Sequence, residues 1–121
     1  MAKMPDDLKT MFEKQLAVIA TAGKDGAPNV GPKGSIHALD DETLIYAEST
    51  GKKTLANLKE NPKVMLLAMD RLTGKGYQVR GTAQLVASGE LFDRVAKRQL
   101  ERKRSVPKLV VMIKVGEIFP V

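Results

Sequence analysis

The segment Ser-Thr-Gly-Lys-Lys at residues 49–53 places hydroxyls, a glycine and two lysines at the start of a predicted short helix, residues 51–60. A helix N-terminus carries a partial positive charge and unpaired backbone N–H groups, so acidic side chains are favoured there and lysines are not. A bound anion would account for the lysines. Ser49 and Thr50 offer hydroxyls, Gly51 permits close approach of the backbone, and the free N–H groups are oriented donors. The segment is typical of a phosphate site, although solvated lysines behind an ordinary Ser49 N-cap would also fit.

The same helix has a polar face and an apolar face. Lys53 and Asn57 lie about 40° apart around the helix, whereas Leu55 and Leu58 lie near the opposite side and are expected to face the core. The segment is not a nucleotide triphosphatase loop, because Tyr46 stands where that motif needs its first glycine and Lys52 is not followed by Ser or Thr.

Composition removes several classes of function. The chain has 121 residues, a formal net charge of +6, no cysteine and one histidine, His37. Disulfides, thiolate metal sites and a multi-histidine centre within one chain are therefore excluded, and we expect no metal site. No apolar run approaches the roughly 20 residues of a membrane span, and we expect a cytoplasmic protein. The positive charge suits nucleic acid, an anionic surface or an anionic cofactor.

Hydrophobic patterning predicts six strands, with helices at the start and between some of them. The chain should open with a helix over residues 5–14, and a basic helix over residues 90–104 carries an apolar stripe from Leu91 to Leu100. The strands are expected at residues 16–22, 28–39, 43–49, 63–70, 77–87 and 108–115. Short turns join the first three strands and require antiparallel pairing. We predict one mainly β (α+β) domain over residues 1–121, a six-stranded antiparallel barrel or half-barrel with short flanking helices.

The order of elements, the breaks in PNVGPKGSIHAL, the segment IYAESTGKKTLANLKENPKVMLL and the strand GYQVRGTAQLV resemble the FMN-binding split-barrel family related to pyridoxamine 5'-phosphate oxidase. The resemblance covers nearly the whole chain, and its most specific part is the lysine pair after Ser49-Thr50-Gly51. It implies a flavoprotein that holds FMN in a homodimer interface. The chain would then be an FMN-dependent oxidoreductase or an electron carrier with an unknown redox partner.

The resemblance also implies site residues. Lys52 and Lys53 would hold the FMN phosphate together with Ser49 and Thr54, and the ring would lie along residues 31–36, where two glycines and a proline break the strand. Tyr46 and Ala47 would border the ring. Lys33 would place positive charge near its pyrimidine edge or point to solvent, with Arg80 or Gln78 as alternatives for that role. The complete predicted cofactor set is Pro32, Lys33, Gly34, Ser35, Tyr46, Ala47, Ser49, Lys52, Lys53, Thr54, Asn57 and Gln78.

Departures from the family pattern leave alternatives open. The chain ends at KLVVMIKVGEIFPV, without the longer basic C-terminal segment that grips substrate in pyridoxamine phosphate oxidase, so that activity is disfavoured. A deazaflavin could replace FMN, and haem would have to use His37. The helix over residues 90–104, with six basic and three acidic side chains, offers nucleic-acid binding as another class. Exposed aromatic runs that stack bases are missing, so we expect neither nucleic acid nor a membrane as partner.

Overall fold

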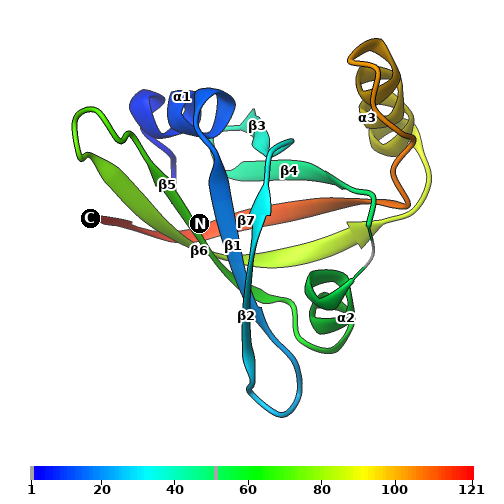
Figure 1. The fold of residues 1–121 in the computed structure, drawn as a ribbon, viewed down its shortest axis with the longest axis horizontal. Coiled ribbons are helices and arrows are strands. Elements are labelled where there is room, and N and C mark those ends of the chain that lie inside the picture. The colour runs from blue at the N-terminus through cyan, green and yellow to red at the C-terminus, as the bar shows by residue number, and fades with distance from the viewer. Residues whose placement is uncertain (1, 51) are drawn as a thin grey trace.

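A computed structural model of the chain describes residues 2–50 and 52–121; the glycine of the predicted phosphate segment, Gly51, lies outside them. In these described residues three helices and seven strands follow one another (Figure 1). The helices are α1 (Asp6–Lys14), α2 (Lys53–Glu60) and α3 (Glu90–Glu101). The strands are β1 (Ala17–Ala22), β2 (Pro28–Lys33), β3 (His37–Asp40), β4 (Thr43–Glu48), β5 (Lys63–Met69), β6 (Gly76–Val86) and β7 (Leu109–Pro120).

All seven strands form one curved sheet in the order β2-β1-β5-β6-β7-β4-β3. Every neighbouring pair is antiparallel, which confirms the pairing predicted from the short turns. The two edge strands, β2 and β3, are consecutive in the chain and are separated only by residues 34–36. The sheet therefore curls back on itself, and the site residues of β2 come close to those of β4.

The number of strands predicted for the barrel or half-barrel was wrong. The segment 28–39 is not one strand, because it pairs first with β1 at one edge of the sheet and then with β4 at the other. The count is therefore seven strands instead of six. In the part of the chain that the structure describes, no ladder joins β2 to β3, so the sheet is not closed.

The main core fills the concave side of the sheet. Leu8 and Phe12 of α1 pack there against strand residues such as Ile19 and Leu44, and all four are almost fully buried. Each such side chain contributes about 1.5–3 kcal/mol by leaving water. Helix α1 thus packs on the concave side of the sheet through its buried residues Leu8, Met11 and Phe12.

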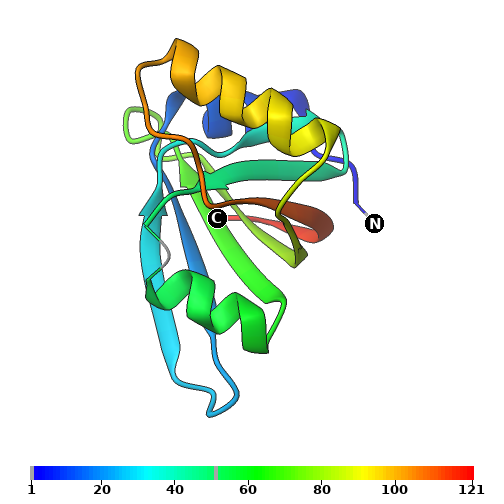
Figure 2. The ribbon, with the colours of Figure 1, turned by 90° about the vertical axis from the view of Figure 1, so that its right-hand side faces the viewer.

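A smaller core lies on the outer side of β4. There Val95 of α3 packs with Ile45, Ala47 and Val110, and α3 and α2 lie at opposite ends of the molecule in Figure 2. All six residues of β4 are consequently buried, because the strand has a core on each face. Alternation sends Leu44, Tyr46 and Glu48 to the concave side, which explains how a glutamate becomes buried. None of the described helices has the length and apolar character needed to cross a membrane.

Candidate functional site

The N-terminus of α2 is open to an anion. Lys52 occupies the N-cap position without a side-chain cap hydrogen bond, and no acidic residue lies in the first turn. Lys52 and Lys53 are exposed, whereas Leu55 and Leu58 are buried, as the helical spacing predicts. The first N–H groups of a helix have no hydrogen-bond partner within the helix. These donors and the two lysines therefore concentrate positive charge at the N-terminus of α2.

A hollow of about 430 Å³ lies at this helix end, and we call it the cradle. Strand β2 forms one wall, and Thr50 and the start of α2 form the other. Its residues are Asn29, Val30, Gly31, Pro32, Lys33, Thr50, Lys52, Lys53 and Thr54. Thr54 is buried, and its Oγ1 accepts a hydrogen bond of 3.2 Å from the Asn29 side chain, which ties α2 to β2. The arrangement can hold a phosphate between helix N–H groups and two ammonium groups.

A second hollow of about 400 Å³ adjoins the cradle and shares Pro32, Lys33 and Thr50 with it. It lies between the β2–β3 link, the end of β4, α3 and the segment after α3. Its full lining is Pro32, Lys33, Gly34, Ser35, Ala47, Glu48, Ser49, Thr50, Gln99, Arg104 and Ser105. Together the two hollows are lined by nine of the twelve predicted cofactor residues.

Lys33 and Glu48 form a buried ion pair at the boundary of the two hollows. The Lys33 Nζ donates to both carboxylate oxygens, at 3.2 and 3.1 Å, and the side chains are 14% and 2% exposed. Lys33 therefore does not point to solvent, one of the two orientations considered from the sequence. Its ammonium also lies 5.1 Å from the centre of the Tyr46 ring, a cation–π distance.

Tyr46 points into the concave core and not into either hollow. Its side chain is fully buried, and its hydroxyl has no hydrogen-bond partner among the described residues. Burial, with a smaller contribution from the Glu48 carboxylate, raises the pKa of Tyr46 far above its ordinary value. The phenol therefore stays protonated, and its ring lies against the Lys33 ammonium.

The other predicted residues occupy different places. Ser35 holds β4 by accepting a hydrogen bond of 3.1 Å from the Ala47 backbone N–H, so Ala47 meets the hollow beside the β2–β3 link. Asn57 donates to Thr21 Oγ1 at 3.1 Å and faces another hollow, on the far side of Lys53. Gln78 is exposed on the outer face of β6, away from both hollows in this chain.

Four residues of the second hollow were missed by sequence reasoning: Glu48, Gln99, Arg104 and Ser105. Glu48 had a signal, since it is a charged residue at the end of a strand that otherwise reads as continuously apolar. Gln99 is only 7% exposed, and within residues 2–50 and 52–121 its amide forms no side-chain hydrogen bond. Gln99 and Arg104 had no usable signal, because only the docking of α3 beside β4 brings them near the site.

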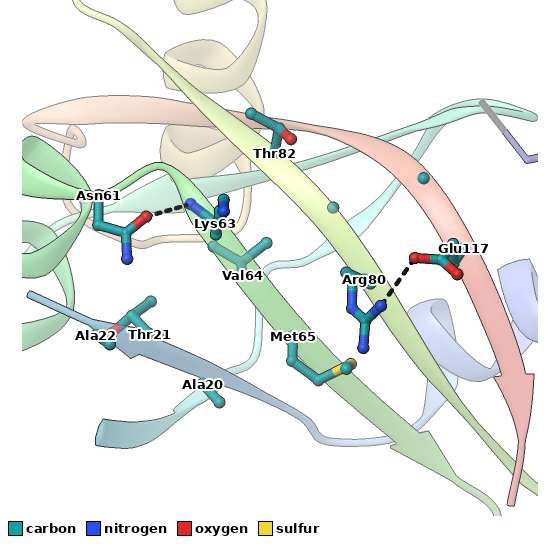
Figure 3. A pocket seen from close by; sticks show the side chains of 12 residues that line it. Ala20, Thr21, Ala22, Asn61, Lys63, Val64, Met65, Arg80, Thr82 and Glu117 are labelled. Carbon is teal, nitrogen blue, oxygen red and sulfur yellow. Dashed lines mark hydrogen bonds and ion pairs between the residues drawn. The ribbon is translucent and has the colours of Figure 1, made fainter. Parts of the chain in front are cut away.

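A hollow of about 680 Å³ lies on the outer face of β1, β5, β6 and β7 (Figure 3). Small residues such as Ala20 and Gly81 line it with Met65, and Arg80 pairs with Glu117 at 2.8 Å on its rim. Arg80 therefore points to the outer face, away from the cradle.

Comparison with known proteins gives consistent matches over nearly the full length. Residues 4–121 match the family described as pyridoxamine 5'-phosphate oxidase. An uncharacterized protein, MJ0282, from Methanocaldococcus jannaschii is 35% identical over 97% of this chain and 80% of its own length. The crystal structure of HupZ from Group A Streptococcus has a TM-score of 0.92 at 36% identity, covering 98% of this chain and 94% of that one. A candidate pyridoxamine 5'-phosphate oxidase from Lactobacillus delbrueckii has a TM-score of 0.82 at 32% identity, covering 97% and 93%.

More distant structures share the fold alone. They include an FMN-binding protein from Syntrophomonas wolfei (23% identity, TM-score 0.81), an F420 reductase (21%, 0.72) and the haem storage protein HutZ from Vibrio cholerae (18%, 0.74).

Proposed function

Since this chain belongs to the pyridoxamine 5'-phosphate oxidase family, we propose that it binds FMN, with the phosphate in the cradle, and acts as an oxidoreductase or electron carrier. The observation that carries the proposal is the uncapped N-terminus of α2, where Lys52 and Lys53 meet free N–H groups and no acidic side chain. Without an anion this arrangement is electrostatically unfavourable, and a phosphate makes it favourable.

The chain's own residues fit the cofactor in three ways. The cradle supplies two ammonium groups for a phosphate, and Thr50 and Thr54 add hydroxyls beside them. The second hollow gives the rest of the molecule a place to lie, bounded by the β2–β3 link and by Ala47. FMN supplies the redox chemistry when bound, while the protein binds and orients it and tunes its surroundings.

We further propose that the functional unit is a homodimer with the cofactor at the interface. In support, the two hollows are open depressions, and the outer face of β1, β5, β6 and β7 carries small side chains around its own broad hollow (Figure 3). Gln78, exposed on that same face of β6, would then approach the cofactor of the partner subunit.

A deazaflavin coenzyme is the second candidate. The phosphate of such a coenzyme would suit the cradle for the same physical reason, and an F420 reductase shares the fold. Haem would have to use His37, whose Nδ1 is 3.0 Å from the Ser35 carbonyl oxygen and which lines neither the cradle nor the second hollow. The basic outer face of α3 is solvated in this proposal.

The colour of the purified protein tests these alternatives. We expect a flavin absorption spectrum, and FMN, not FAD, released on denaturation and identified by chromatography. A deazaflavin spectrum would move the second candidate to first place, and a Soret band would do the same for haem. A colourless protein that takes up no added FMN would contradict the proposal.

A further inference from the structure

Lys33 is the only charged side chain that lines both the cradle and the second hollow in the described part of the chain. Its long aliphatic stem would allow the ammonium to serve either hollow. The structure instead fixes it against the Glu48 carboxylate, with contacts to both oxygens of a side chain that is 2% exposed. Glu48 lines the second hollow and not the cradle.

The net charge of the second hollow depends on the Glu48 carboxylate. Lys33 and Arg104 are both cationic and line the same space, together with the hydroxyls of Ser35, Ser49 and Ser105. Without Glu48 the second hollow would hold two cations and several hydroxyl donors, much like the cradle. An anion entering it would then have a second favourable position.

With Glu48 present, the second hollow is a poor phosphate site. The carboxylate occupies the Lys33 ammonium and repels a phosphate dianion at close range, in surroundings that screen charge less than bulk water does. The cradle has no comparable acidic residue in its described lining. The two hollows are thus matched in size but not in charge.

We propose that Glu48 is a positioning residue that keeps phosphate out of the second hollow by neutralising Lys33, and so fixes which end of FMN lies in each hollow. The inference rests on the proposed function, since it takes the cradle as the phosphate position. In this account Glu48 determines where the phosphate binds: it binds in the cradle at the N-terminus of α2 and not in the second hollow beside Arg104.

The test compares the affinities of FMN and riboflavin, measured by quenching of flavin fluorescence, in Glu48→Gln, Arg104→Gln and the double variant. Glu48→Gln should raise the preference for FMN over riboflavin by about twofold or more, because a second position comparable with the cradle becomes available to the phosphate and the two association constants add. Adding Arg104→Gln should remove most of that gain. A merely structural role of Glu48 would change both ligands alike and leave the ratio unchanged. Glu101→Gln, an equal change of charge at an exposed position of α3, is the control and should not alter the ratio.

The single variant Arg104→Gln gives a second test, which leaves the buried Lys33–Glu48 ion pair intact. Arg104 is exposed, so this variant should fold. Because Arg104 lines the hollow proposed for the rest of the cofactor, the affinities for FMN and riboflavin should change alike and their ratio should stay the same. A tenfold loss of that preference would show that phosphate already enters the second hollow and would overturn the inference, as would an unchanged ratio in folded Glu48→Gln. If the parent itself binds FMN no better than riboflavin, it is the proposed function that fails.

Discussion

At the scale of single residues, the site is defined by charges placed where the fold alone would not favour them. Lys52 and Lys53 stand at the positive end of a helix, and Glu48 lies in the core at the end of β4. Each position costs stability in the empty protein. Such conflicts between local rules and the observed residue are expected at functional sites.

Lys53→Ala should therefore have opposite effects on stability with and without ligand. In the empty protein it relieves an unfavourable dipole contact of about 0.3–1 kcal/mol, so the variant should be as stable as the parent or slightly more stable. With saturating FMN the variant should be less stable than the parent, because weaker binding adds less to the free energy of unfolding. Thermal denaturation with and without FMN measures both. Lys59→Ala, exposed in the last turn of the same helix, is the control and should not gain stability when empty.

His37 should make stability depend on pH in a defined direction. Burial, assisted by Arg98 and Arg102 and opposed by the Ser35 carbonyl, lowers the pKa of His37 below its ordinary value. The unfolded chain then binds this proton more readily than the folded chain, so stability falls as pH drops below the unfolded pKa of about 6.5. The parent should lose more thermal stability than His37→Gln between about pH 7.5 and pH 5. Equal losses in the two proteins would show that His37 does not contribute.

At the scale of elements, the features that depend on contacts between residues close in the sequence could be predicted, and those that depend on contacts between distant residues could not. The sequence predicted a helix over residues 51–60 with Leu55 and Leu58 inside, and α2 over Lys53–Glu60 confirms the helix and its buried face, because helix patterns are local. The division of residues 28–39 was not predicted, since it depends on β2 and β3 pairing with different partners at opposite edges of the sheet. In the same way the lysines of the cradle were visible in the sequence, while Gln99 and Arg104 required the docking of α3.

Gly34, in the β2–β3 link, and Gly81, in β6, should respond differently to alanine. A Cβ on Gly81 would lie 2.6 Å from the Lys114 carbonyl oxygen and 2.7 Å from Ile113 Cγ2, so Gly81→Ala should destabilise by about 1–3 kcal/mol. A Cβ on Gly34 would meet no described atom within 4 Å. Gly34→Ala should leave the empty protein unchanged or up to about 1 kcal/mol more stable, by restricting the unfolded chain.

FMN affinity distinguishes a structural glycine from a ligand-facing one. If a flat ring approaches the backbone at the β2–β3 link, Gly34→Ala should weaken FMN binding although the fold is intact. Denaturant titration and fluorescence quenching on the same preparation give both quantities. An intact Gly34→Ala protein that binds FMN as tightly as the parent would argue against close approach at this position.

At the scale of the whole molecule, an open seven-stranded sheet leaves the outer face of β1, β5 and β6 without a covering helix (Figure 1). We expect sedimentation to show a homodimer that FMN stabilises, since a ligand that binds only the assembled form shifts the equilibrium toward it. Ala20→Glu, which places a charge in the hollow of that face, should give a monomer. Leu72→Glu makes the same change at a 97% exposed turn residue and should remain dimeric. A parent that is monomeric at every concentration and still binds FMN tightly would contradict a shared site.

The central claim is that the N-terminus of α2 holds the phosphate of FMN, and the binding of FMN and riboflavin to parent and Lys53→Ala tests it most directly. Loss of a charge-assisted hydrogen bond should weaken FMN binding by about 1.5–3 kcal/mol, or about 10- to 150-fold in Kd. Riboflavin lacks the phosphate and should bind both proteins almost equally. An equal loss of affinity for the two ligands, or no loss for either, would show that Lys53 does not hold the phosphate and that the cradle has been assigned wrongly.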